Sequence, residues 1–180
     1  MEPLKRKNLR MGAYDYSMPG LYFITICTDN RKALFSHIVG AHHDAPAQIE
    51  LTPKGKIVED VIKILPDRFK IKIKNYVIMP DHIHILIELV DYEGYERALR
   101  EAPLQREAPL QRKAPPKDRS TIAKCIGFLK AEVTKKIRCT EPKAKVWQRR
   151  FFDHVIRNEK DYLKHFDYIE DNPNVWVMNR

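Results

Sequence analysis

The chain has 180 residues, 43% of them hydrophobic and 32% charged, which fits one domain with its own core. Its 33 Lys and Arg against 24 Asp and Glu give a net charge of +9, typical of nucleic-acid-binding proteins but also of an ordinary solvated basic surface. Three widely spaced cysteines argue against a disulfide framework and a thiolate zinc site, and no segment looks like a signal or membrane anchor. We therefore expect a cytoplasmic protein.

The first part of the chain combines a basic arm with strand patterns. Residues 1–20 are polar and rich in turn formers. Residues 21–27 are dense in β-branched and aromatic side chains, which predicts a strand. Short strands are also expected around residues 33–39 and 48–51.

A helix and a hairpin follow. Thr52-Pro53 is a typical helix start, and the apolar spacing after it predicts a helix that ends at Pro66. Residues 69–79 and 82–90 predict two strands joined by a tight turn, because apolar residues alternate with lysines in the first and dominate the second.

A short repeat then breaks the pattern. Six residues beginning at Arg100 recur from Arg106, each copy with a proline, and a repeat this short cannot build a packed solenoid. We interpret residues 91–119 as a low-complexity loop insertion within a single domain that spans residues 1–180.

The last part of the chain predicts a helix from Ser120 to about residue 138, a strand over residues 146–156 and a helix over residues 159–170, which ends before Asn172-Pro173. The whole order is strand, helix, strand, strand, helix, strand, helix. That order predicts an α+β, ferredoxin-like fold, in which a split β-α-β antiparallel sheet carries helices on one face and an extra helix follows at the C-terminus.

His82 and His84 form the first candidate site. Residues i and i+2 of a strand point to the same face, so both imidazoles project together while Ile83 packs on the other side. Two adjacent imidazoles suit a divalent metal ion. The alternative is that they are two surface histidines on an edge strand, which would have the same sequence pattern. Two ligands are also too few, so a third must come from elsewhere.

Tyr168 and Asn172 form the second candidate site, on the last predicted helix. Its apolar stripe is Tyr162, Leu163, Phe166 and Ile169, and Tyr168 points well away from the centre of that stripe. Asn172 lies one turn further on and can reach what Tyr168 reaches. Its amide oxygen suits Mg²⁺ or Mn²⁺, but an Asn that simply ends a helix before Pro is the alternative.

Three stretches together resemble a known family. The run of eleven residues from Tyr76, which contains His82-Ile83-His84, looks like the HUH motif of single-tyrosine transposases, in which U is a bulky apolar residue. The run from Val146 to Asn158, followed by Asp-Tyr168-Ile-x-x-Asn172-Pro, is similar to REP-associated tyrosine transposases (RAYTs), as is the opening Tyr14-Asp-Tyr with Pro19-Gly-Leu-Tyr-Phe. The proline-containing repeat is not an element of that family.

The resemblance implies a fold of the HUH-endonuclease type and a role for each motif residue. His82, His84 and Asn172 would hold Mg²⁺ or Mn²⁺, and Tyr168 would be the nucleophile. The reaction would cleave and rejoin single-stranded DNA, next to hairpins, through a 5′-phosphotyrosine intermediate. The protein could act as a monomer or a homodimer.

The substrate would meet basic and aromatic side chains. Lys130, Arg149 and Arg150, with Arg6 and Arg10 in the arm, are candidates for phosphate contacts, although a solvated basic face would carry the same residues. Trp147 and Phe152 could stack on bases or pack in the core. Two other functions stay open: a non-catalytic module that binds single-stranded nucleic acid, and a metal-dependent phosphodiesterase in which water attacks.

Overall fold

A four-stranded antiparallel sheet forms the centre of the molecule. The computed structural model describes residues 19–40, 46–90 and 121–178. The sheet runs in the order β4-β5-β1-β6, and each neighbouring pair of strands is antiparallel. The four strands are β1 (Gly20–Cys27), β4 (Ile71–Ile78), β5 (His82–Leu89) and β6 (Phe152–Ile156). Together with the helices between them, this order confirms the predicted ferredoxin-like α+β fold.

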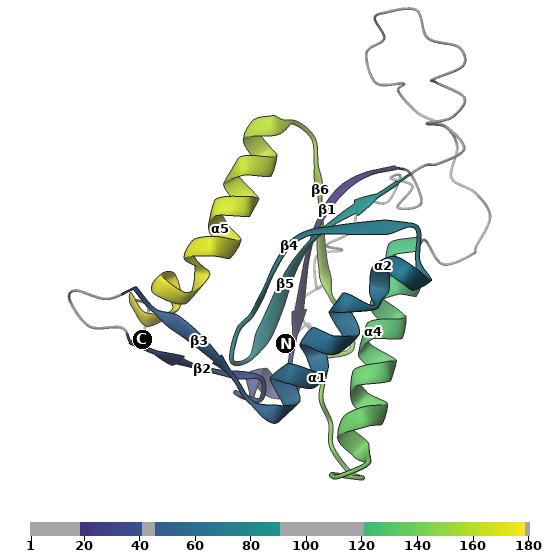
Figure 1. The fold of residues 1–180 in the computed structure, drawn as a ribbon, viewed down its shortest axis with the longest axis vertical. Helices are drawn as coiled ribbons and strands as arrows, with labels where there is room; N and C mark the ends of the chain where they lie inside the picture. Colours follow the sequence, from purple (N-terminus) through teal and green to yellow (C-terminus); the bar gives the residue numbers. More distant parts are fainter. Residues whose placement is uncertain (1–18, 41–45, 91–120, 179–180) are drawn as a thin grey trace, which may run out of the picture.

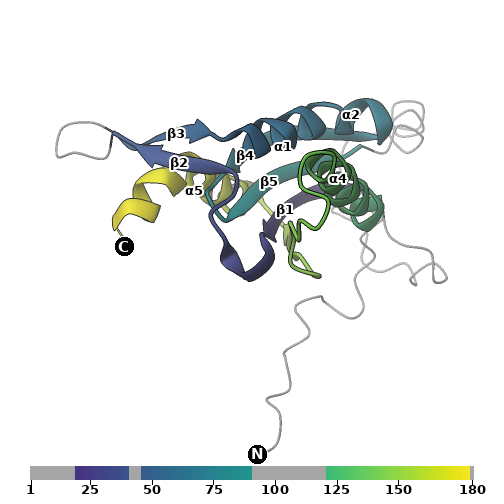
Figure 2. The same cartoon turned by 90° about the horizontal axis from the view of Figure 1, so that it is seen from below.

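Helices cover both faces of the sheet (Figures 1 and 2). The two crossover helices, α1 (Pro53–Lys63) and α4 (Thr121–Arg138), pack on one face, with the short α2 (Leu65–Arg68) after α1. The C-terminal helix α5 (Glu159–Met178) packs on the opposite face. The extra helix expected at the C-terminus therefore covers the side of the sheet that the ferredoxin-like core leaves open.

Strand alternation divides the apolar side chains between two cores. The odd-numbered isoleucines of β5, Ile83, Ile85 and Ile87, are fully buried toward α1 and α4. On the other face, Phe23 and Leu86 pack with Ile169 of α5. Each strand thus presents one face to the main core and the other to the C-terminal helix.

A small hairpin extends from the sheet beside the end of α5 (Figure 1). It pairs β2 (Ser36–Val39) with β3 (Gln48–Leu51) and follows the short 3-10 helix η1 (Asp29–Arg31). The sequence predicted both short strands but not their pairing, and the first begins later than expected. The backbone N–H of Ala47 donates to Asn174 Oδ1 over 2.9 Å, which ties the hairpin to α5.

Some predicted elements have different bounds in the structure. The first helix ends at Lys63 rather than at Pro66, which lies instead in the first turn of α2, where proline is tolerated. The last helix does not end before Asn172 but continues to Met178 with Pro173 inside it. Proline removes one helical hydrogen bond, and here Pro173 is buried, so packing offsets that loss. The strand predicted over residues 146–156 covers only Phe152–Ile156, because the backbone around Trp147 pairs with Thr28 at the end of β1 instead of extending β6.

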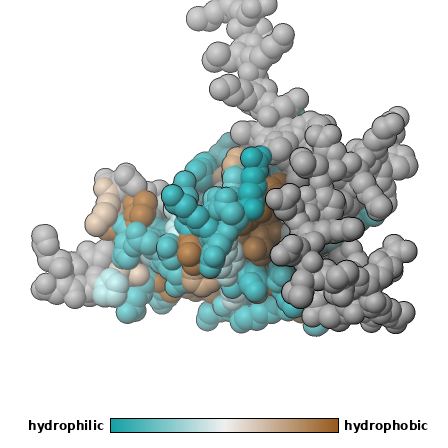
Figure 3. Space-filling view, turned by 90° about the horizontal axis from the view of Figure 1, so that it is seen from above, coloured by the Kyte–Doolittle hydropathy of each residue, from teal (hydrophilic) through white to brown (hydrophobic). Residues whose placement is uncertain are grey.

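The face shown in Figure 3 is mostly hydrophilic, with hydrophobic residues scattered in small areas. None of the helices in the described segments has the length and apolar character needed to cross a membrane. Arg6 and Arg10, and the repeat that begins at Arg100, lie outside the described residues.

Candidate functional site

His82 and His84 lie side by side on the face of β5 that α5 covers. β5 is an interior strand, between β4 and β1, so the alternative of surface histidines on an edge strand is wrong. Only 7% of His82 and 5% of His84 is exposed, while Ile83 between them is buried in the main core. The two rings lie 4.6 Å apart at 76° to each other.

Hydrogen bonds fix the Nδ1 atom of each ring. Asp81 Oδ1 lies 2.6 Å from His82 Nδ1, and Thr25 Oγ1 lies 2.8 Å from His84 Nδ1. A carboxylate that holds a histidine in this way fixes its tautomer and leaves Nε2 as an acceptor. His84 Nε2 is buried and has no hydrogen-bond partner among the described residues. Buried polar atoms are rarely left so, which makes this nitrogen a candidate ligand atom.

Burial keeps both imidazoles neutral. It lowers the pKa of His84 to about 3, with the neighbouring His82 as the next cause. Burial also lowers the pKa of His82, although the hydrogen bond to Asp81 acts in the opposite direction. Neutral imidazole is the form that binds a metal ion, so the site has the required protonation at neutral pH.

Helix α5 brings Tyr168 and Asn172 to these histidines. The ring of Tyr168 lies 5.2 Å from that of His84 and 6.0 Å from that of Phe23, and 43% of the tyrosine is exposed. Asn172, one turn further on, is only 4% exposed, and its side chain lies near enough to His82 to act against the lowering of that histidine's pKa by burial. The structure therefore gathers His82, His84, Tyr168 and Asn172 in one place.

The apolar stripe predicted for this helix is wrong in one position. Leu163 is 49% exposed, whereas the side of α5 that faces the sheet buries Ile169, Asn172 and Pro173. Sequence periodicity alone could not show this, since a buried Asn that faces two histidines replaces an apolar residue in the stripe.

A cleft of about 520 Å³ opens beside Tyr168. Thr25 and His84 line it from the sheet, and Lys164 and Tyr168 line it from α5. Phe152, at the start of β6, lies at the same cleft and is 39% exposed. The cleft thus presents an exposed phenol, an ammonium group, an aromatic face and two carboxylates, those of Asp167 and Asp171.

The predicted phosphate-contact residues lie elsewhere. Arg149 and Arg150 are exposed just before β6. The Nζ of Lys130 donates to the backbone carbonyls of Gln148 and Arg149, at 2.5 and 3.2 Å, so this lysine holds the segment that carries Arg149. Burial lowers the pKa of Lys130. Trp147 packs against Phe35, with ring centres 4.9 Å apart.

A second polar cluster, which the sequence analysis missed, joins β6 to the first turns of α5. His154 Nε2 lies 2.9 Å from Asp161 Oδ2, and His165 Nδ1 lies 3.2 Å from Asp161 Oδ1. The ligand atoms of these three residues lie within 4.8 Å of one another, close enough to hold a metal ion. The cluster cannot be predicted from the spacing of its residues in the sequence, because His154 belongs to β6 whereas Asp161 and His165 belong to α5.

Comparisons with known proteins show which family the chain belongs to. No protein-family model matches the chain. A Haemophilus influenzae protein named for the REP-associated tyrosine transposases is 30% identical over 159 residues, which cover 88% of this chain and 73% of that protein. The chain belongs to the REP-associated tyrosine transposase family.

Two other proteins and a solved structure extend this result. The REP-associated tyrosine transposase of Escherichia coli K12 is 26% identical over 159 residues, covering 88% of this chain and 68% of its own. An uncharacterized protein of Haemophilus influenzae is 35% identical over 176 residues, covering 97% and 92%. A solved structure of a REP-associated tyrosine transposase bound to a REP hairpin matches the fold with a TM-score of 0.54 at 21% identity, covering 91% of this chain and 70% of that one.

Proposed function

We propose that this member of the RAYT family is a metal-dependent, single-tyrosine endonuclease and transposase, which cleaves and rejoins single-stranded DNA through a 5′-phosphotyrosine intermediate. The proposal depends on one observation above all. The partly exposed Tyr168 lies 5.2 Å, ring to ring, from His84, whose buried Nε2 has no partner in the described part of the chain. The candidate nucleophile and this histidine line the same cleft.

His82, His84 and Asn172 fit a divalent cation. Two imidazoles whose rings lie 4.6 Å apart, together with an amide oxygen, can hold a divalent cation, for which we propose Mn²⁺ or Mg²⁺. The cluster around Asp161 is a second candidate for a cation, because its three ligand atoms lie within 4.8 Å of one another. When bound at His82 and His84, a cation would supply Lewis-acid polarisation of the scissile phosphate.

Tyr168 would carry the covalent step. Its phenolic oxygen attacks the phosphorus, a Tyr168 Oη–P bond forms, and the bond from phosphorus to the 3′ oxygen breaks. The phenol gives up its proton and the departing 3′ oxygen gains one, which leaves a 3′-OH on one fragment. The phosphodiester energy is stored in the phosphotyrosine, so a later 3′-OH can rejoin the strand without ATP.

The substrate we propose is single-stranded DNA next to a hairpin. The net charge of +9 suits a polyanion, and the structurally similar transposase was solved with a REP hairpin. Phe152 gives the cleft an exposed aromatic face on which an unpaired base can stack. Lys164 lies in the same cleft and would contact phosphate.

A covalent-trapping assay tests the proposal. The protein is incubated with an end-labelled DNA hairpin that has single-stranded flanks, with Mn²⁺ or Mg²⁺, and separated on a denaturing gel. We expect a protein-linked band that requires metal and disappears in Tyr168→Phe. Tyr162→Phe is the matched control, because Tyr162 is on the same helix but packs against Phe166, outside the cleft.

Other results would refute the proposal in different ways. Cleavage that persists in Tyr168→Phe, without a protein-linked band, would indicate a phosphodiesterase that uses water. Binding without cleavage or adduct over a panel of hairpins, including REP hairpins, would indicate a non-catalytic binding module.

A further inference from the structure

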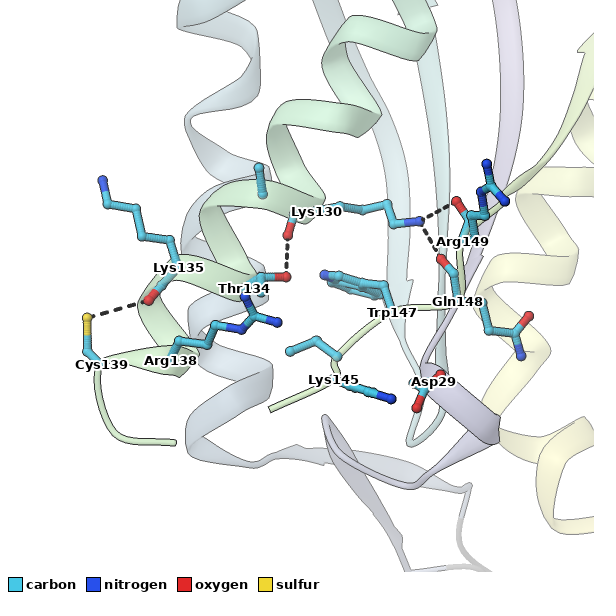
Figure 4. A pocket seen from close by; sticks show the side chains of 12 residues that line it. Asp29, Lys130, Thr134, Lys135, Arg138, Cys139, Lys145, Trp147, Gln148 and Arg149 are labelled. Carbon is cyan, nitrogen blue, oxygen red and sulfur yellow. Dashed lines mark hydrogen bonds between the residues drawn. The ribbon is translucent and has the colours of Figure 1, made fainter. Parts of the chain in front are cut away.

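A second concave surface lies on the other side of the sheet from Tyr168, between α4 and the segment Lys145–Arg149 (Figure 4). Its volume is about 880 Å³, within the range of pockets that hold ligands of nucleotide size. Figure 4 shows the indole of Trp147 between its two walls, with the guanidinium of Arg138 extending toward it from α4. We call this surface the α4 groove.

The walls of the α4 groove are held firmly. The backbone N–H of Asp29 donates to the carbonyl of Val146 over 2.9 Å, and that of Gln148 donates to Cys27 over 3.0 Å. Lys130 of α4 clamps the carbonyls of Gln148 and Arg149 from the opposite wall (Figure 4). The groove is therefore a built feature of the fold rather than a gap between loose loops.

The lining of the α4 groove is strongly basic. Among the described residues that form it, five are basic and Asp29 alone is acidic. The five are Lys130, Lys135, Arg138, Lys145 and Arg149. Trp147 supplies an aromatic surface among these cations. Basic side chains that alternate with an aromatic ring are the combination that binds single-stranded nucleic acid, with phosphates on the cations and a base against the ring.

The chain itself connects the α4 groove to the Tyr168 cleft. Trp147 lines the groove and Phe152 lines the cleft, and the five-residue step between them spans at most about 18 Å. The exposed Arg149 and Arg150 lie on this path around the β6 edge of the sheet. A DNA strand that leaves the cleft at Phe152 would thus pass Arg150 and Arg149 before it reaches the groove.

We infer that the α4 groove binds the single-stranded DNA segment that flanks the scissile phosphate, with Arg138 and Lys145 on its phosphates and Trp147 against a base. This inference rests on the proposed function, because it assigns a path to the same substrate. The groove would contribute to DNA affinity independently of the reaction at Tyr168.

Salt-dependent binding without metal tests this inference. The variant Arg138→Gln/Lys145→Gln removes two exposed charges from the groove, and Lys70→Gln/Lys72→Gln removes two exposed charges at and just before β4, the opposite edge of the sheet. Affinity for a labelled dT20 strand and for a blunt duplex is measured by fluorescence anisotropy in EDTA over a range of NaCl. With dT20 we expect the slope of log affinity against log salt to become shallower by about 1.4 in the groove variant only, since each phosphate contact to a single strand contributes about 0.7. The duplex slope should not change.

Each other result overturns the inference. An unchanged slope with dT20, an equal change in the β4 control, or no dT20 binding by the unsubstituted protein would remove the groove as a DNA site. A change with the duplex, alone or together with dT20, would assign the groove to a hairpin stem or to general attraction. Because no cleavage occurs in EDTA, a failure of Tyr168 as the nucleophile leaves this test intact, and a failure here leaves the trapping assay intact.

Discussion

Acidification should destabilise the metal-free protein through His84. The pKa of this histidine falls from 6.5 to about 3 on folding, chiefly because the ring is buried. Below pH 6.5, His84 binds a proton in the unfolded chain but stays neutral in the folded protein. Stability is therefore lost as the pH falls from about 6.5 toward 3. A pH of 5 lies about 1.5 units below the pKa of 6.5 in the unfolded chain. At 1.36 kcal/mol per unit, the free energy of unfolding is therefore lowered by about 2 kcal/mol.

Urea unfolding in EDTA at pH 7.5 and pH 5 measures this loss. Other groups also titrate in this range, so the comparison is with His84→Asn, which places an amide near the position of Nδ1 and cannot take up the proton. We expect the original protein to lose about 2 kcal/mol more than this variant between the two pH values. His37→Asn, which removes an exposed histidine of β2, is the control. An equal pH dependence in the original protein and His84→Asn would refute the reasoning.

Three further predictions concern the support of the site and of the fold. Asp81→Asn should weaken Mn²⁺ binding about 10- to 100-fold by calorimetry, because Asp81 orients the ring of His82, and unchanged affinity would show that this contact does not support metal binding. Gly55→Ala should unfold the protein or destabilise it by roughly 3 kcal/mol or more, because a Cβ at this position would lie 1.9 Å from the backbone oxygen of Phe35. The control is Gly127→Ala on α4, where a Cβ meets no other atom within 4 Å. In the same denaturation assay, this control should stabilise the protein by about 0.5–1 kcal/mol. Thr52→Ala should cost about 1 kcal/mol of unfolding free energy, because Thr52 Oγ1 accepts from Gly55 N at the start of α1, and no change would show that the cap is dispensable.

Much of the fold follows from local sequence patterns. The strands and helices of the ferredoxin-like core have periodicities of two and 3.6 residues, and Thr52-Pro53 begins α1 as expected from helix capping. His82 and His84 face the same side because strands alternate. These features depend on neighbouring residues only, so the sequence is sufficient to predict them.

The errors arise where distant contacts decide the structure. The β6 strand begins at Phe152 because Lys130 binds the carbonyls before it and Thr28 pairs with Trp147, and neither contact has a signal in the local sequence. The long α5 depends on the burial of Pro173. The meeting of His154 with Asp161 likewise depends on how α5 returns to the sheet. Local propensity cannot predict contacts of this kind.

The packing of α5 onto the sheet has a consequence for genetic complementation. The helix delivers Tyr168 and Asn172 to histidines of its own chain, so every proposed participant comes from one polypeptide. A mixture of Tyr168→Phe with His84→Ala molecules should then recover no activity, because each molecule lacks one residue of the site that it builds from its own chain. Two damaged copies could rescue each other only if α5 left its sheet and packed on that of a neighbour.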